Sequence, residues 1–233
     1  MATLYGLGVG PGDPDLITLK ALKILQAAPV IAYPATTSGE SMARAIAAPH
    51  IPAGRIELPF AIDIRTAHDA NEGHYDSGAE AVAAHLKAGR DVAVLCEGDP
   101  FLYGSFMYLF ARLAEDWPVR IVPGISSLNA AAAALAHPLV SGNESLTLIP
   151  ATLPEEELTL RLKACEAAAI LKVGRHLPKL KRALIASGLM ERASYVERVG
   201  FPEQRQCALK DLAADAAPYF SIVLARRAEQ AIR

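Results

Sequence analysis

The chain has 233 residues, of which 52% are hydrophobic and 21% are charged, and its formal net charge is −2. This length and apolar content allow one large domain or two small ones and argue against disorder. The charge balance excludes a global positive field that would gather nucleic acid, and no polybasic tract is present to attract a membrane surface.

Cysteine usage and apolar runs narrow the class further. The three cysteines Cys96, Cys165 and Cys207 are far apart and form no Cys-x-x-Cys pair, so neither a disulfide framework nor a protein-bound metal is expected. No apolar stretch reaches the roughly 18 residues of a spanning helix. We therefore expect a soluble, reduced, cytoplasmic protein that binds neither membrane nor nucleic acid.

Short apolar runs alternate with helical patterns along the first half of the chain. This alternation predicts a layered α/β fold with a mostly parallel sheet, covered on both faces. The expected strands are 3–9, 30–33, 55–58 and 91–96, and the expected helices are 16–27, 41–48, 76–88 and 106–114.

The segment Glu115-Asp-Trp-Pro118 breaks this pattern, so a boundary is expected between domains 1–116 and 117–233. In the second half, closely spaced late strands indicate a mixed sheet. The expected strands are 119–122, 145–149, 168–173, 194–199 and 219–225, and the expected helices are 126–135, 155–164 and 177–187.

Three corners join a strand to a helix through glycine and proline. They are Gly6–Pro14, the run Glu97-Gly-Asp-Pro-Phe-Leu-Tyr-Gly104 and Val122-Pro-Gly-Ile-Ser-Ser127. In α/β proteins, ligands bind outside the carboxyl ends of the strands, where such corners lie. Three corners of this kind predict a composite ligand site.

The first corner does not fit a nucleotide-binding fingerprint. Pro11 and Asp13 occupy the turn that would hold a phosphate, and no Gly-Lys-Ser/Thr follows. No acidic residue ends the second strand, where Tyr33-Pro34 stands instead. A tight turn that serves packing alone is the alternative for this corner.

The other two corners carry polar side chains with two interpretations each. Carboxylates at Glu97 and Asp99 favour a cation or a hydroxyl-rich ligand over a phosphate. Ser126 and Ser127 offer hydroxyl groups at a helix start. Asp99 and either serine fit equally well as simple helix caps.

Four motifs in order give the chain a resemblance, nearly end to end, to the tetrapyrrole methylases, which are S-adenosylmethionine-dependent enzymes. The motifs are Val9-Gly-Pro-Gly-Asp-Pro-Asp-Leu-Ile-Thr18, Gly98-Asp-Pro-Phe-Leu-Tyr-Gly104, Pro123-Gly-Ile-Ser-Ser127 and His137-Pro-Leu139. The resemblance implies two α/β domains with the cofactor in the cleft between them, a tetrapyrrole substrate and a homodimer.

The resemblance also implies which residues contact S-adenosylmethionine. These are Glu97, Gly98, Asp99, Leu102, Tyr103, Ser126, Ser127 and Val173, together with Phe201, Pro202 and Ser221 on later loops. Many relatives that methylate pyrrole carbons carry an aspartate where this chain has Pro34. This departure indicates a different acceptor carbon and leaves the catalytic base unassigned.

The tetrapyrrole side of the site is expected at the first corner, over Gly10, Pro11, Gly12 and Asp13. Substrate carboxylates require local cations, for which Arg44, Arg55, Arg65 and Lys20 are candidates, although each fits a solvated surface charge as well. His68, His74 and Tyr33 are candidates for the base. A solvated loop is the alternative for both histidines.

Other functions stay open at this point. Within the family, the ring could be metal-free or cobalt-filled, or a different ring carbon could be methylated. Outside it, a non-catalytic nucleotide-binding module could use the same glycine corners. Binding of S-adenosylhomocysteine in preference to phosphates discriminates these classes.

Overall fold

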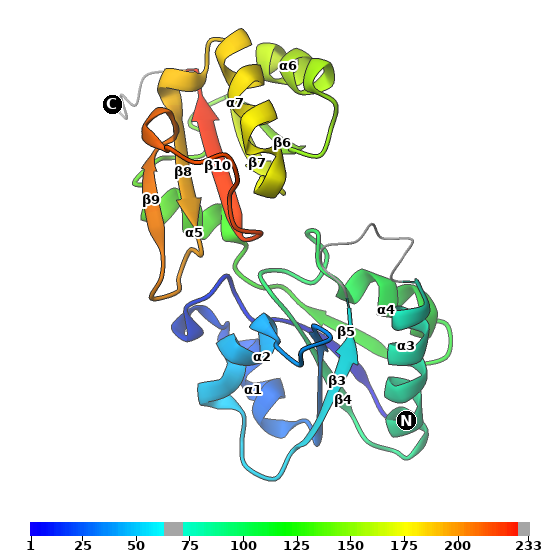
Figure 1. The fold of residues 1–233 in the computed structure, drawn as a ribbon. Helices are drawn as coiled ribbons and strands as arrows, with labels where there is room; N and C mark the ends of the chain where they lie inside the picture. The colour runs from blue at the N-terminus through cyan, green and yellow to red at the C-terminus, as the bar shows by residue number, and fades with distance from the viewer. Residues whose placement is uncertain (63–71, 228–233) are drawn as a thin grey trace. The chain divides into compact units, whose positions relative to one another are not determined.

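A computed structural model of the protein describes residues 1–62 and 72–227, which form two compact units divided after Ser126 (Figure 1). The sequence placed the division after residue 116. The difference arises because β5 (Val119–Val122) pairs with β1 (Leu4–Gly8) and so completes the first sheet instead of opening the second.

The first unit is built on a five-stranded sheet of order β3-β2-β4-β1-β5, in which every pairing is parallel. Its central strands are buried along their whole length, as continuous apolar runs predict for a sheet covered on both faces. The remaining strands are β2 (Val30–Ala35), β3 (Ile56–Ala61) and β4 (Val92–Cys96).

Helices cover both faces of this sheet. The connections through α1 and α2 run in one direction across the strands, whereas those through α3 and α4 run in the other. Right-handed crossovers therefore place the two pairs on opposite faces (Figure 1). The helices are α1 (Leu19–Ala27), α2 (Met42–Ala47), α3 (Glu72–Lys87) and α4 (Phe106–Leu113), with short η1 (Pro14–Leu16) and η2 (Ala48–His50).

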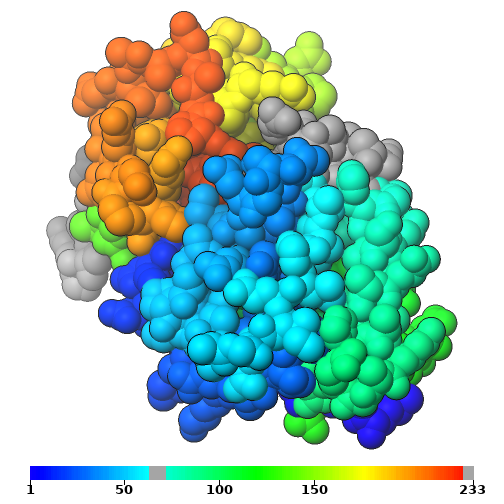
Figure 2. All heavy atoms as spheres, turned by 60° about the horizontal axis from the view of Figure 1, so that its bottom comes forward, coloured from blue at the N-terminus to red at the C-terminus, as the bar shows by residue number. Residues whose placement is uncertain are grey.

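Local sequence explains where these helices begin. The side chains of Thr18 and Ser41 accept hydrogen bonds from the backbone N–H groups of Ala21 and Arg44, which caps α1 and α2. On the face of the sheet that α3 and α4 cover, Phe106 and Leu109 of α4 are fully buried in the core. Figure 2 shows residues of the light-blue to cyan range, which include α2 and β3, over one exposed face of this unit.

The second unit has a mixed five-stranded sheet of order β6-β7-β10-β8-β9. Only β6 and β7 pair in parallel, and the other neighbours are antiparallel. The strands are β6 (Leu146–Pro150), β7 (Ala167–Leu171), β8 (Ala193–Glu197), β9 (Arg205–Ala208) and β10 (Ser221–Arg226). The predicted class, two α/β domains with a parallel and then a mixed sheet, is confirmed.

Two cores lie on the two faces of this second sheet. Leu128 and Ala131 of α5 pack on one face, and Leu158 of α6 and Leu180 of α7 pack on the other. The helices are α5 (Ser127–Ala134), α6 (Glu155–Ala164) and α7 (Leu177–Ala186), with short η4 (Gly174–His176), η5 (Met190–Arg192) and η6 (Leu209–Asp211). Among the described residues, no helix combines the length and apolar character needed to cross a membrane.

Candidate active site

Three corners of the first unit meet at the carboxyl ends of β1, β4 and β5. A Cβ atom on Gly124 would lie 1.9 Å from the carbonyl oxygen of Gly98 and 2.8 Å from the Cα atom of Gly8. A Cβ atom on Gly8 would lie 2.5 Å from the Cα atom of Gly124. Only glycine permits this approach, so the three glycines explain how the predicted corners come together.

Backbone hydrogen bonds join the first two corners. The N–H of Gly98 donates to the carbonyl oxygen of Gly10 at 2.8 Å. In return, the N–H of Gly10 donates to the carbonyl oxygen of Gly98 at 3.4 Å. Both glycines have positive φ angles, 83° at Gly10 and 62° at Gly98, which L side chains adopt at a cost. The two turns therefore form one preorganised surface.

Asp99 joins the second corner to the third. One carboxylate oxygen accepts a hydrogen bond from the N–H of Phe101 at 2.9 Å, and the other accepts one from the N–H of Gly124 at 3.1 Å. Both oxygens thus act on backbone groups of the site itself. The carboxylate orders the corners, which places the surface for a ligand on the backbone around it.

The second corner ends in three exposed apolar residues, Phe101, Leu102 and Tyr103. Tyr103 has a left-handed backbone with a φ of 56°, a strained conformation that clusters at functional sites. Gly104 follows because a Cβ atom there would lie 2.5 Å from the carbonyl oxygen of Pro100. The predicted residues Leu102 and Tyr103 therefore lie on the same surface as Gly98.

Glu97 differs from its neighbours in its environment. The residue as a whole is partly exposed, and Oε1 accepts a hydrogen bond from the N–H of Ala43 in α2 at 3.1 Å. Burial raises the pKa of this carboxyl group above its usual range. The preceding Cys96 lies in the core on the other face, where burial raises the thiol pKa to about 12 and keeps the thiol neutral.

The predicted residues Tyr33 and Arg44 meet at Glu57, a residue that the sequence analysis missed. The guanidinium of Arg44 donates to both oxygens of Glu57, at 2.9 and 3.0 Å, and the hydroxyl of Tyr33 donates to one of them at 2.7 Å. Arg44 and Tyr33 together lower the pKa of the Glu57 carboxyl. Burial and Glu57 raise the pKa of the Tyr33 hydroxyl, so Tyr33 stays protonated.

The first corner keeps the predicted segment Gly10–Asp13 at the carboxyl end of β1. Asp13 caps η1, and its carboxylate accepts a hydrogen bond from the N–H of Asp15 at 2.9 Å. Gly12 is buried, and Pro11 is half-buried. The segment therefore belongs to the same edge as Gly98.

Other predicted residues are not brought to this edge. Arg55 precedes β3 at the opposite, amino edge of the sheet, and its guanidinium donates to the carbonyl oxygen of Gln26 at 2.5 Å. His74 is exposed in the first turn of α3, and Lys20 is exposed on α1. Arg65 and His68 lie outside the described residues.

The second unit has an edge of its own that gathers the other predicted cofactor contacts. Val173 follows β7 and is fully buried, and Ser221 is the first residue of β10. Phe201 and Pro202 lie in the turn after β8, where the N–H of Phe201 donates to the carbonyl oxygen of Arg198 at 3.0 Å. All four residues thus stand at the edge where β7 and β8 end.

Two strained residues mark this edge, and no sequence signal predicted them. Lys172 follows β7 with a φ of 56°, and Arg198 follows β8 with a φ of 50°. The hydroxyl of Ser221 donates to the carbonyl oxygen of Pro218 at 2.8 Å and lies 3.1 Å from the hydroxyl of Tyr195, which also bonds Glu197. Ser221 is therefore held from two sides.

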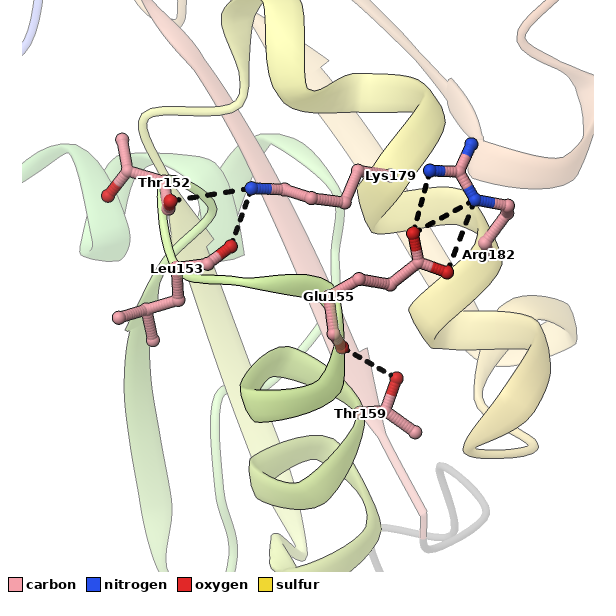
Figure 3. A network of polar contacts seen from close by, with 6 residues as sticks. All are labelled: Thr152, Leu153, Glu155, Thr159, Lys179 and Arg182. Carbon is pink, nitrogen blue, oxygen red and sulfur yellow. Dashed lines mark hydrogen bonds and ion pairs between the residues drawn. The ribbon is translucent and has the colours of Figure 1, made fainter.

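A polar network holds the turn after β6 against α7 (Figure 3). The ammonium of Lys179 donates to the carbonyl oxygens of Thr152 and Leu153, at 3.3 and 2.5 Å. The guanidinium of Arg182 pairs with the carboxylate of Glu155 at 2.7 Å. These contacts join the turn to α7, and the Arg182–Glu155 pair stays exposed to solvent.

Ser126 and Ser127 connect the two units, and Ser127 is the first residue of α5. Both are half-buried at the end of the third corner. Within residues 1–62 and 72–227, no group of three or more histidine, cysteine, aspartate or glutamate side chains is placed to hold a metal ion.

Comparison with known proteins finds relatives that match nearly the whole length of this chain. Residues 3–213 match the family model of the tetrapyrrole (corrin/porphyrin) methylases. The chain is 46% identical over 229 residues to a precorrin-2 C(20)-methyltransferase of Sinorhizobium sp, covering 95% of this chain and 94% of the relative. It is 31% identical over 235 residues to a cobalt-precorrin-2 C(20)-methyltransferase of Salmonella typhimurium, covering 96% of each.

A solved structure supports the fold. The uroporphyrin-III C-methyltransferase of Thermus thermophilus, in complex with S-adenosylhomocysteine, superposes with a TM-score of 0.69 at 23% identity, covering 96% of this chain and 97% of that chain. At this identity the likeness concerns the fold.

Proposed function

Because the chain belongs to the tetrapyrrole (corrin/porphyrin) methylase family, we propose that it transfers the methyl group of S-adenosylmethionine to C20 of precorrin-2. The product is precorrin-3A, an intermediate of cobalamin biosynthesis. The relative at 46% identity carries the name of this activity. Tyr33-Pro34, the corner Asp99–Ser105 and the late Tyr219-Phe-Ser221 give the sequence-level resemblance to the same enzyme.

One observation carries the proposal: Gly8, Gly98 and Gly124 bring three backbone turns into contact, and Asp99 ties two of them together. None of the segments 6–16, 96–105 and 122–128 contains lysine, arginine or histidine. Such corners suit a donor with a positively charged sulfonium better than a phosphate. The donor's predicted contacts are Glu97, Gly98, Asp99, Leu102, Tyr103, Ser126, Ser127, Val173, Phe201, Pro202 and Ser221.

The chemistry requires orientation more than an activated side chain. The bound donor supplies an electrophilic methyl group, and C20 of the reduced ring is enamine-like and already nucleophilic. Holding two reactants in line lowers a barrier by about 7–11 kcal/mol. The preorganised corners supply this alignment, while the neutral thiol of Cys96 takes no part.

The substrate's carboxylates still need cations, and the first unit offers fewer than the sequence indicated. Arg44 forms a bidentate ion pair with Glu57, and Arg55 lies at the opposite edge of the sheet. The backbone of Gly10, Pro11, Gly12 and Asp13 remains the predicted surface on the tetrapyrrole side. Arg65 lies outside the described residues and stays a candidate.

Cobalt-factor II is the second candidate substrate, because the relative at 31% identity is named for a cobalt-containing ring. The higher identity to the precorrin-2 enzyme favours the metal-free ring. Methylation of another ring carbon remains the alternative within the family. A homodimer and a cytoplasmic location remain predictions, and sedimentation of the purified protein tests the first.

Two assays test the function. Calorimetry should show binding of S-adenosylhomocysteine and no comparable binding of ATP, whereas a nucleotide-binding module would show the reverse. The purified enzyme should then methylate precorrin-2 faster than cobalt-factor II. A preference for the cobalt ring would assign the protein to the second candidate.

A further inference from the structure

We propose that the carboxylate of Glu97 accepts the proton that C20 loses after methylation. The inference rests on the proposed function, which otherwise lacks an assigned base. It concerns the end of β4, where the chain leaves the sheet at its carboxyl edge.

Glu97 lies at the point of the sheet where ligands are expected to bind. In the strand order β3-β2-β4-β1-β5, neighbours β2 and β4 send their connections in opposite directions, to β3 and to β5. Open α/β sheets bind ligands where neighbouring connections diverge in this way. The hydrogen bond from Ala43 of α2 to Glu97 spans this point.

Backbone N–H groups hold the Glu97 carboxyl group, while burial raises its pKa. Cys96 points into the core on the α3 and α4 face, so Glu97 points to the α2 side, where Ala43 holds Oε1 at 3.1 Å. The residue as a whole is partly exposed. The next residue, Gly98, forms the bridge to Gly10.

The other candidate groups at this edge are already engaged. Both carboxylate oxygens of Asp99 accept backbone N–H groups, and Asp13 caps η1. Tyr33 of β2 donates its hydroxyl hydrogen to Glu57, which lies near the amino end of β3 and is held by Arg44. Glu97 is a partly exposed residue at this edge, and burial of its carboxyl group raises the pKa of that group.

The charges around Glu97 agree with this role. Burial raises its pKa, which moves a carboxyl group towards the range of an effective general base near neutral pH. Cys96 is neutral, with a thiol pKa of about 12. Asp99 is two residues away on the same corner, and Arg44 of α2 turns its guanidinium to Glu57. No cation described here therefore pairs with Glu97.

The reaction balances with this acceptor. The C20–CH3 bond forms as the S–CH3 bond breaks, and the bonding pair stays on sulfur to give the neutral thioether. The ring then holds a delocalised positive charge and a C20–H bond. That hydrogen leaves as a proton to the Glu97 carboxylate, its bonding pair restores the conjugated ring, and the carboxylic acid later releases the proton to water.

Glu97→Gln tests the proposal, because the amide oxygen can still accept the Ala43 N–H whereas the amide cannot act as a base. Turnover of precorrin-2 at saturating S-adenosylmethionine should fall about 100-fold or more, a loss that does not depend on the predicted contact of Glu97 with the donor. Deuterium at C20 should slow Glu97→Gln more than the wild type, since proton loss becomes rate-limiting. Glu97→Asp should retain intermediate activity.

Glu80→Gln, at an exposed carboxylate of α3, serves as the control and should match the wild type. Turnover of Glu97→Gln within about three-fold of the wild type would overturn the proposal. So would a loss that disappears at saturating S-adenosylmethionine, or a loss without a larger isotope effect. Absence of wild-type turnover on precorrin-2 would instead refute the proposed function, so the two failures are distinguishable.

Discussion

The carboxylate of Asp99 accepts a hydrogen bond at 3.1 Å from the backbone N–H of Gly124, which follows β5. The same carboxylate holds Phe101 in its own turn. Two corners from separate strands are therefore fixed by one side chain, and their backbone is ordered before a ligand arrives. Preorganisation of this kind lowers the cost of binding.

Asp99→Ala removes both acceptors and leaves two N–H groups without their partner. We expect a loss of about 2 kcal/mol in the free energy of unfolding and at least a ten-fold weaker affinity for S-adenosylhomocysteine. Asp99→Asn keeps one acceptor oxygen and should fall between. Denaturant unfolding and calorimetry measure both, and an Asp99→Ala protein with unchanged affinity and turnover would contradict the ordering role.

Gly124→Ala tests the convergence of the corners. Its Cβ atom would lie 1.9 Å from the carbonyl oxygen of Gly98, so one corner must move, at a cost of about 3 kcal/mol in stability. Gly73→Ala is the matched control, since nothing lies within 4 Å of that Cβ position and alanine favours the helix. If Gly124→Ala bound S-adenosylhomocysteine like Gly73→Ala, the packed corner would not be the cofactor surface.

Tyr33→Phe separates a structural role from a catalytic one. The hydroxyl of Tyr33 donates to Glu57, and its pKa is raised, so it is not expected to act as a base. The substitution should cost about 1 kcal/mol of stability and leave kcat within about two-fold. Steady-state kinetics on the folded variant test this expectation. A kcat lowered by orders of magnitude would mean that Tyr33 takes part in the reaction.

Opposite pKa shifts at Glu97 and Glu57 predict opposite effects of pH on stability. The raised pKa of Glu97 means that its ionisation costs stability as pH rises through the folded-state pKa. The melting temperature of Glu97→Gln should therefore exceed that of the wild type more at pH 8 than at pH 4.

Glu57 behaves in the reverse sense because Arg44 lowers its pKa. Its stabilising contribution is present above the ordinary carboxyl pKa and is lost as pH falls through the lowered value. Glu57→Gln should lower the melting temperature at pH 8 and have little effect at low pH. The same trend for both variants in pH-dependent thermal unfolding would disprove the assignments.

The fold could be predicted because apolar runs and glycine turns act locally. Continuous apolar strands such as Val92–Cys96 indicated the parallel sheet. β9 (Arg205–Ala208) was missed because it has mostly exposed side chains, which give no apolar signal. The boundary after residue 116 was misplaced because the pairing of β5 with β1 is a contact between distant segments.

The site residues that could be predicted are those in which a sequence motif itself forms the backbone turn. Gly98 and Asp99 were named from the corner, but the partner of Asp99, the N–H of Gly124, required coordinates. Arg44 was expected to face the substrate, and its pairing with Glu57 depends on the packing of α2 on the sheet. The left-handed backbones of Lys172 and Arg198 are set by tertiary structure and have no signature in residue type.

The site of methylation is the most direct test of the whole account. Precorrin-2 should be incubated with the purified protein and S-adenosylmethionine carrying a 13C methyl group, and the product examined by NMR and mass spectrometry. The account predicts one added methyl group, with the label on C20. A labelled methyl on any other ring carbon, or no transfer by protein that binds S-adenosylhomocysteine, would contradict it.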